Sequence, residues 1–117
     1  MSESAYHLLS KGREFLENGH PHAAVVVLDR AKLVEPDKVS IREALGRALA
    51  AIHRWQRARR EFAKAVAISP ADDYAHFALG LACARTGQRT RAIAHLKLAV
   101  AMAPRDEYRA ALERLAP

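Results

Sequence analysis

The stretch LGRALAAIHRWQRARREFAKAVAISP, residues 45 to 70, decides the fold because its small residues recur elsewhere at a fixed interval. A glycine, two alanines and a proline of this stretch each recur 34 residues earlier and 34 residues later. Self-similarity at such a period is the signature of repeat architectures. The sequence therefore predicts three copies of one unit. The recurring sets are Gly12, Gly46 and Gly80; Ala24, Ala58 and Ala92; Ala31, Ala65 and Ala99; and Pro36, Pro70 and Pro104.

Local signals make each copy a pair of helices joined by a short turn. The small residues let two helices approach closely, and the proline, which lacks a backbone donor, ends the second helix. Gly19 and Gly87 mark the turn inside copies one and three. Ser4, Asp72 and Asp106 stand where an N-cap residue is expected. The repeated unit is therefore predicted to be an antiparallel helical hairpin.

The pattern resembles the tetratricopeptide repeat, a helix-turn-helix unit of 34 residues. The resemblance covers residues 5 to 104. The chain departs from the pattern at Lys11, where leucine is usual, and at Arg42 and His76, where an aromatic residue is usual. The closest matches to the pattern are Leu45-Gly46, Leu79-Gly80, Ala58, Phe62, Ala65 and Pro70.

The resemblance implies an all-α fold in which three antiparallel hairpins stack into a right-handed superhelix. A capping helix is expected to follow, because the last residues carry an apolar stripe that would cover the exposed end of the third hairpin. This stripe consists of Tyr108, Ala111, Leu112 and Leu115. The prediction is seven helices in a single domain over residues 1-117, with repeats at about 5-38, 39-72 and 73-106 and the capping helix at about 107-116.

Stacked hairpins present an extended concave surface. The resemblance implies that the first helix of each hairpin lines this surface with the second, fifth, ninth and twelfth residues of its repeat. The predicted surface is apolar at both ends and carries Arg13 and Arg47 along its middle. The predicted partner-binding residues are Tyr6, Leu9, Arg13 and Leu16 from copy one, Glu43 and Arg47 from copy two, and Tyr74, Phe77, Leu81 and Arg85 from copy three.

This groove predicts a protein-interaction module or scaffold. A peptide or helix of another protein would insert apolar side chains while an acidic group meets the arginines. The competing interpretation is that neighbouring hairpins bury the apolar residues as ordinary core. Family members that clamp chaperone tails use lysine, asparagine and arginine at certain groove positions, so that role is disfavoured here. This chain has Leu9, Arg13, Ala44, Tyr74 and Ala78 at those positions.

The sequence predicts no enzyme, no cofactor and no metal site, because it lacks the nucleophile, base and orienting group that catalysis needs. Cys83 takes the apolar position shared with Phe15 and Leu49 and is expected to be a small core residue. His20-Pro21-His22 has a metal-like spacing, but no cysteine or carboxylate cluster accompanies it. The other histidines, His7, His53, His76 and His95, fall at unrelated repeat positions.

The net charge of +6, from 19 basic and 13 acidic residues, leaves nucleic-acid binding as a minor alternative. Its focus would be HRWQRARR, residues 53 to 60, where a tryptophan stands among four arginines. In register, this stretch is the turn and the start of a second helix, with His53 at the position of the turn glycines. Trp55 is expected to pack at the hairpin corner. Arg59 aligns with apolar residues, Val25 and Ile93, and nothing in the repeat explains it.

A further alternative is homo-oligomerisation through hairpin one. Val26 and Val27 occupy outward positions where copy two has Arg60 and Glu61, and exposed apolar residues there need a partner.

The sequence predicts a cytoplasmic protein without membrane contact. The N-terminus lacks the basic start and apolar core of a secretion signal. No apolar run approaches the roughly 20 residues that span a bilayer. A single cysteine excludes an intrachain disulfide.

Overall fold

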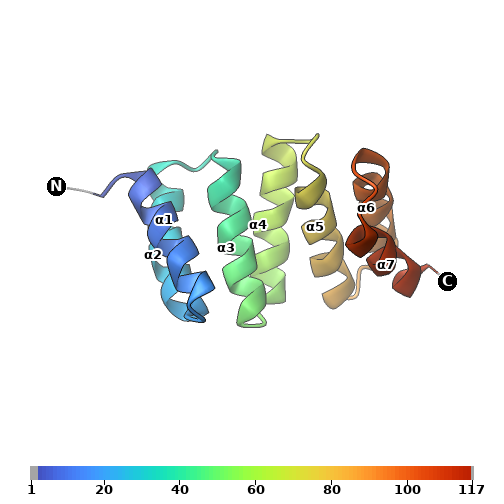
Figure 1. Cartoon of the computed structure of the whole chain (residues 1–117), viewed down its shortest axis with the longest axis horizontal. Coiled ribbons are helices and arrows are strands. Elements are labelled where there is room, and N and C mark those ends of the chain that lie inside the picture. The colour runs from blue at the N-terminus through green and yellow to red at the C-terminus, as the bar shows by residue number, and fades with distance from the viewer. Residues whose placement is uncertain (1–2, 117) are drawn as a thin grey trace.

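The structure, a computed structural model, describes residues 3–116, and within them the chain forms seven α-helices and no strand. The fold is therefore all-α, as predicted. The molecule is elongated, with principal extents of 52 × 25 × 22 Å, and its termini lie at opposite ends of the row of helices (Figure 1). The helices are α1 (Ala5–Glu17), α2 (Pro21–Val34), α3 (Val39–Ala51), α4 (Trp55–Ile68), α5 (Asp73–Arg85), α6 (Arg89–Met102) and α7 (Asp106–Leu115).

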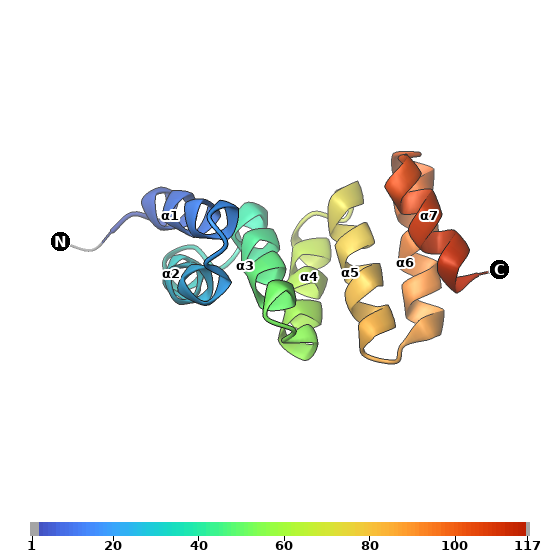
Figure 2. The same cartoon turned by 60° about the horizontal axis from the view of Figure 1, so that its bottom comes forward.

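Three antiparallel hairpins follow one another along the chain, formed by α1 with α2, α3 with α4, and α5 with α6. Each hairpin packs on the next, and α7 packs against α6 at the end of the row, as Figure 2 shows from a second side. None of the helices in residues 3–116 combines the length and the apolar character that crossing a membrane requires.

Three buried glycines set the distance between the two helices of each hairpin. A Cβ atom placed on any of them would lie 2.5 to 2.9 Å from the large side chain opposite, closer than van der Waals contact allows. The helices can therefore approach only because this side chain is absent. The pairs are Gly12 with Leu28, Gly46 with Phe62 and Gly80 with Leu96.

Side-chain caps begin two of the helices as predicted, but not the last one. Ser4 accepts a hydrogen bond from the backbone N–H of His7 at 3.1 Å, and Asp72 accepts one from that of Ala75 at 3.2 Å. The prediction for Asp106 is wrong, because α7 begins one register position earlier than the first helices of the hairpins and its N-cap is Arg105. Asp106 is instead the first residue of α7, where its negative charge opposes the helix dipole favourably.

The turn inside each hairpin uses a left-handed backbone conformation. Gly19 and Gly87 have φ values of +76° and +78°, and His53 has a φ of +60° at the equivalent position. Left-handed φ is costly for a residue with a Cβ atom. The second hairpin therefore carries a strained residue where its neighbours carry glycine.

We expect His53→Gly to raise the free energy of unfolding by about 0.5–1 kcal/mol, since relief of the strain outweighs the extra entropy of an unfolded glycine. Urea denaturation followed by circular dichroism measures the change. The matched control is His53→Ala, which removes the same ring and its edge contact with Trp55 but keeps the Cβ atom. A glycine variant no more stable than the alanine variant would contradict the left-handed turn.

In the second hairpin and in the third, a pair of side chains joins the two helices. The two pairs stand at equivalent repeat positions but differ in chemistry. In the second hairpin, Arg42 Nη1 donates to Glu61 Oε1 at 2.9 Å. In the third, the Nδ1 atoms of His76 and His95 lie 3.0 Å apart, and the rings stack with centroids 5.3 Å apart. His76 and His95 do fall at different repeat positions, as expected, but they are not scattered, because they pack on each other across the hairpin. The equivalent residues of the first hairpin, Leu8 and Val27, are both in the buried core.

Candidate functional site

The first helices of the three hairpins together line a cavity of about 410 Å³. Its walls come from α1, α3 and α5, which the predicted groove requires. Four predicted partner-binding residues, one from α1, two from α3 and one from α5, meet in this central cavity. The lining residues are Arg13, Ser40, Glu43, Ala44, Arg47 and Tyr74.

The two arginines of the central cavity have no anionic partner in the part of the chain that the structure describes. Arg13 and Arg47 are both exposed. Among residues 3–116, no carboxylate oxygen lies within 4.0 Å of either guanidinium group. Their hydrogen-bond donors are therefore free to meet an anionic group from outside.

Glu43 does not neutralise these arginines at neutral pH. Burial, and then the hydrogen bond and negative charge of Asp72, raise the pKa of its carboxyl from 4.5 to about 8, against the opposing charges of Arg13 and Arg47. Glu43 is therefore mostly protonated at pH 7, and the cavity keeps a net positive charge. Sequence reasoning missed Asp72 as a neighbour of this cavity, because its position predicts only the capping of α5.

We expect Glu43→Gln to stabilise the fold increasingly as pH rises. The folded-state pKa lies above the unfolded value of 4.5, so the folded protein binds the extra proton, and wild-type stability falls as pH rises from about 4.5 to 8. Glutamine does not ionise and escapes this loss. The expected gain is near zero at pH 4 and about 1–2 kcal/mol at pH 9, after allowance for solvent screening of a half-buried group.

Urea denaturation of both proteins at several pH values measures this difference. Glu17→Gln, an exposed substitution on α1, is the matched control for the loss of one carboxylate. A Glu43→Gln effect that does not change with pH would show that Glu43 ionises normally in the folded protein.

Phe77 is a predicted partner-binding residue that the structure places elsewhere. Its ring stacks on the buried ring of Tyr108 in the capping helix, with centroids 4.5 Å apart and planes inclined by 27°. Tyr74, which does line the central cavity, also lies near Phe77, with ring centroids 6.4 Å apart. The repeat pattern describes the hairpins without their cap, so it could not show that α7 covers Phe77.

The residues predicted from copy one divide between surface and core. Tyr6 is exposed but does not line the central cavity. Leu9 is only 4% exposed and belongs to the hydrophobic core, so the expectation that it faces a partner is wrong. The reason is that α1 packs against α3 as well as α2. Leu16 is half-buried against the same core.

Leu81 and Arg85 lie in a separate cavity of about 340 Å³ between α4, α5 and α7. Arg85 holds its guanidinium carbon 5.1 Å from the centre of the Trp55 ring, an arrangement typical of a cation–π contact. Residues of α7 form the far wall, so the capping helix divides the predicted apolar end of the groove. The lining residues are Trp55, Leu81, Ala84, Arg85, Ala111, Arg114 and Leu115.

A row of stacked helical hairpins with a cavity along the first helices defines an α-solenoid. The profile of the family described as "Tetratricopeptide repeat" matches residues 9–73 and again residues 44–107. The chain therefore belongs to the tetratricopeptide-repeat family. Among curated proteins, no sequence matches it.

Solved structures of the same fold superimpose closely at low sequence identity. The first tetratricopeptide-repeat domain of Spaghetti (RPAP3), bound to the HSP90 peptide SRMEEVD, has a TM-score of 0.93 at 17% identity, covering 99% of this chain and 93% of that one. The Yersinia enterocolitica secretion chaperone SycD, with a peptide of the translocator YopD, has 0.87 at 15%, covering 98% and 94%. MamA from Desulfovibrio magneticus RS-1 has 0.90 at 26%, covering 96% of this chain and 64% of that one.

Proposed function

We propose that the protein is a non-enzymatic interaction module whose central cavity binds a short segment of another protein. An acidic group of that segment would lie between Arg13 and Arg47, and an apolar side chain would pack on Tyr74. The observation that carries this proposal is the pair of exposed guanidinium groups in a cavity of about 410 Å³, neither of which has a carboxylate partner among the residues described. Charge-assisted hydrogen bonds to such groups are among the stronger polar contacts in recognition.

Two structural relatives support peptide binding by this fold. Spaghetti (RPAP3) and SycD were each solved with a peptide of another protein, and the peptide SRMEEVD contains three acidic residues. Chaperone tails are not the proposed ligand. At the positions where tail-binding relatives carry clamp residues, this chain has Leu9, Arg13, Ala44, Tyr74 and Ala78, and Leu9 is buried.

Selection of binders from a random peptide library tests the proposal. We expect enriched peptides to combine an acidic residue with an apolar one, and to bind Arg13→Glu/Arg47→Glu at least tenfold more weakly, because each lost charge-assisted hydrogen bond is worth about 1.5–3 kcal/mol. Replacing the acidic residue of a peptide by lysine should restore part of its affinity for this variant. The variant keeps Phe77, although it is a predicted partner-binding residue, because its ring packs on Tyr108 of the capping helix.

The matched control is Arg30→Glu/Arg109→Glu, which makes the same change in net charge at exposed arginines outside the central cavity. We expect its peptide affinities to stay within about threefold of wild type, since distant surface charges are screened. Equal losses in both double variants would reduce the effect to overall charge and remove the cavity from the proposal.

Self-association is a second candidate function, supported by one observation on the first hairpin. Val26, Leu33 and Val34 of α2 are 56%, 81% and 50% exposed, and their spacing places them on one helical face. Val27, the other residue predicted to face outward, is buried at 8% exposure. Sedimentation over a wide concentration range tests the idea, with Val26→Ser/Leu33→Ser as the dissociating variant. A wild-type monomer at the highest concentration would eliminate it.

A further inference from the structure

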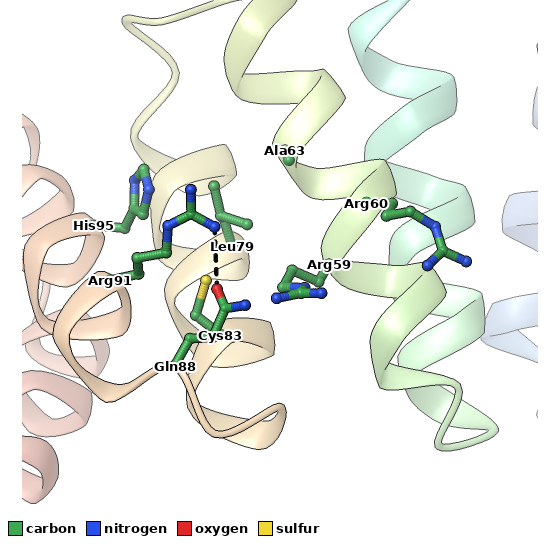
Figure 3. Close-up of a pocket in the computed structure, with 8 residues that line it drawn as sticks. All are labelled: Arg59, Arg60, Ala63, Leu79, Cys83, Gln88, Arg91 and His95. Carbon is green, nitrogen blue, oxygen red and sulfur yellow. Dashed lines mark hydrogen bonds between the residues drawn. The ribbon is translucent and has the colours of Figure 1, made fainter.

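A cavity of about 430 Å³ opens on the face built by the second helices, between α4 and α6, with α5 at its base (Figure 3). None of its lining residues is shared with the central cavity. The lining includes Arg59 and Arg60 of α4, Cys83 of α5, Gln88 at the N-cap of α6, and Arg91 and His95 of α6. It contains no aspartate or glutamate.

Arg59 and Arg91 extend into this cavity and are oriented by neutral amides. Arg59 Nη2 donates to Gln56 Oε1 at 2.7 Å, and Arg91 Nη1 donates to Gln88 Oε1 at 3.2 Å. Figure 3 shows both side chains reaching into the space between α4 and α6 beside Cys83, whereas Arg60 points to the other side of α4. The amide oxygens fix the two guanidinium groups without neutralising their charge, and each group keeps several N–H donors unused.

Two nearby arginines are arranged differently, because they have carboxylate partners. Arg57 Nη2 lies 3.0 Å from Asp29 Oδ1, and Arg42 Nη1 lies 2.9 Å from Glu61 Oε1. Within residues 3–116, no carboxylate lies within 4.0 Å of Arg59 or Arg91. Arg59 is half-buried and Arg91 is exposed. A half-buried cation without an anion is unfavourable, so an anion from outside would lower the free energy of Arg59 in this site.

His95 and Cys83, which line the cavity, and His76, which contacts His95, add no negative charge. His76 Nε2 lies 2.8 Å from the carbonyl oxygen of Pro70, which can only accept, so His76 Nε2 carries a proton. In the neutral pair, His76 Nδ1 then accepts from the Nδ1–H of His95. Burial lowers the pKa of His95, as do the neighbouring His76 and Arg91. Burial raises the pKa of the Cys83 thiol, against the charges of Arg59 and Arg91. Neither group offsets the arginines.

We propose that Arg59 and Arg91 form a binding site for a phosphate monoester group on the face opposite the first helices. A phosphate monoester carries about −1.5 to −2 charges and three acceptor oxygens at pH 7, which matches two guanidinium groups held by different helices. A carboxylate carries one charge and two oxygens, which a single arginine can satisfy. Nucleic acid fits less well, because the neighbouring Arg57 and Arg42 are already paired with carboxylates and offer fewer free donors to a run of phosphates.

NMR titration of the full chain, in buffer free of phosphate and sulfate, tests this site. The probe is phenyl phosphate, a phosphate monoester. We expect the shifted signals to come from the guanidinium groups of Arg59 and Arg91, the Gln88 amide and the His95 ring. Arg59→Gln/Arg91→Gln should weaken binding by about a hundredfold, since each lost charged hydrogen bond costs at least about tenfold. Arg59→Lys/Arg91→Lys keeps the charge but loses the planar fork, and should give an intermediate loss.

The matched control is Arg30→Gln/Lys97→Gln, which removes two exposed positive charges elsewhere and should change the affinity less than about threefold. Signals scattered over the surface, or equal losses in the two glutamine variants, would overturn the proposal. Two further probes separate the sources of the group. Tighter binding of a phosphoserine peptide than of phenyl phosphate would indicate a modified protein, and the reverse order a small phosphate ester. An oligonucleotide that binds while phenyl phosphate does not would overturn the proposal.

Discussion

Gly46→Val is expected to lower the free energy of unfolding by at least about 3 kcal/mol. A Cβ atom on Gly46 would lie 2.5, 2.7 and 2.9 Å from the Cε1, Cζ and Cδ1 atoms of Phe62, and valine adds two further methyl groups. Phe62 is 3% exposed and enclosed by the core, so its ring has no free space into which to move. Forcing extra carbon into a packed core costs about 1–3 kcal/mol or more. Urea denaturation followed by circular dichroism measures the loss.

Arg47→Val, at the next and exposed position of α3, is the control for valine in this helix and should change stability by about 0.5 kcal/mol or less. In a Phe62→Ala background, Gly46→Val should cost less than about 1 kcal/mol, because the new methyl groups occupy the space the ring has left. The resulting coupling of about 2 kcal/mol or more is typical of residues in contact. Additive effects would mean that α3 and α4 do not approach each other in solution as they do in the structure.

This glycine contact could be predicted from the sequence, because three glycines and three large residues recur in the same register. The hairpins, the turn glycines and the burial of Cys83 followed from the same arithmetic and are confirmed. The pairing of His76 with His95 could not be predicted in this way, because a repeat comparison aligns equivalent residues of different copies. It does not show which residues of one copy touch across the hairpin.

Only the middle of the candidate site could be predicted from the sequence. Arg13, Glu43, Arg47 and Tyr74 lie together because the inner stripe of each first helix continues from one hairpin to the next. The two ends of the site differ from the prediction because of contacts that a single repeat does not contain. At the N-terminal end Leu9 is buried because α1 packs against α3. At the C-terminal end the capping helix takes the space that a partner would need.

Arg59, unexplained in the sequence, acquires a role only with the neighbouring hairpin in place. Its aligned residues Val25 and Ile93 are half-buried apolar side chains, and Arg59 is half-buried as well. It shares a cavity with Arg91, which comes from the following hairpin. The two proposed sites lie on opposite helices of the hairpins and share no residue. Variants of one should therefore leave binding at the other unchanged, because distant and separate changes act independently.

Tyr108→Ala is expected to lower the free energy of unfolding by about 3–5 kcal/mol, the usual cost of removing a buried aromatic ring. Tyr108 is 2% exposed, and it holds α7 on α5 in two ways. Its ring stacks on Phe77, and its hydroxyl donates to Asp73 Oδ2 at 2.7 Å. Burial, together with Asp73, raises the pKa of this hydroxyl, so it remains a donor across the physiological pH range. The only other buried residue of α7 is Ala111, which offers little area to replace these contacts.

The loss should appear first in α7, because a terminal helix of a solenoid has neighbours on one side only. Amide hydrogen exchange of Tyr108→Ala should show lost protection in residues 106–115 while α1 and α3 keep theirs. Tyr108→Phe is the matched control: it keeps the stacked ring, removes only the hydrogen bond to Asp73 and should cost about 1 kcal/mol. Equal protection of α7 in both variants would place the stability of the cap elsewhere, in contacts such as those between Arg89 and the Leu115 carbonyl. With α7 detached, Phe77 becomes exposed beside Tyr74, and the central cavity should gain affinity for apolar peptides, because its apolar surface then extends without interruption.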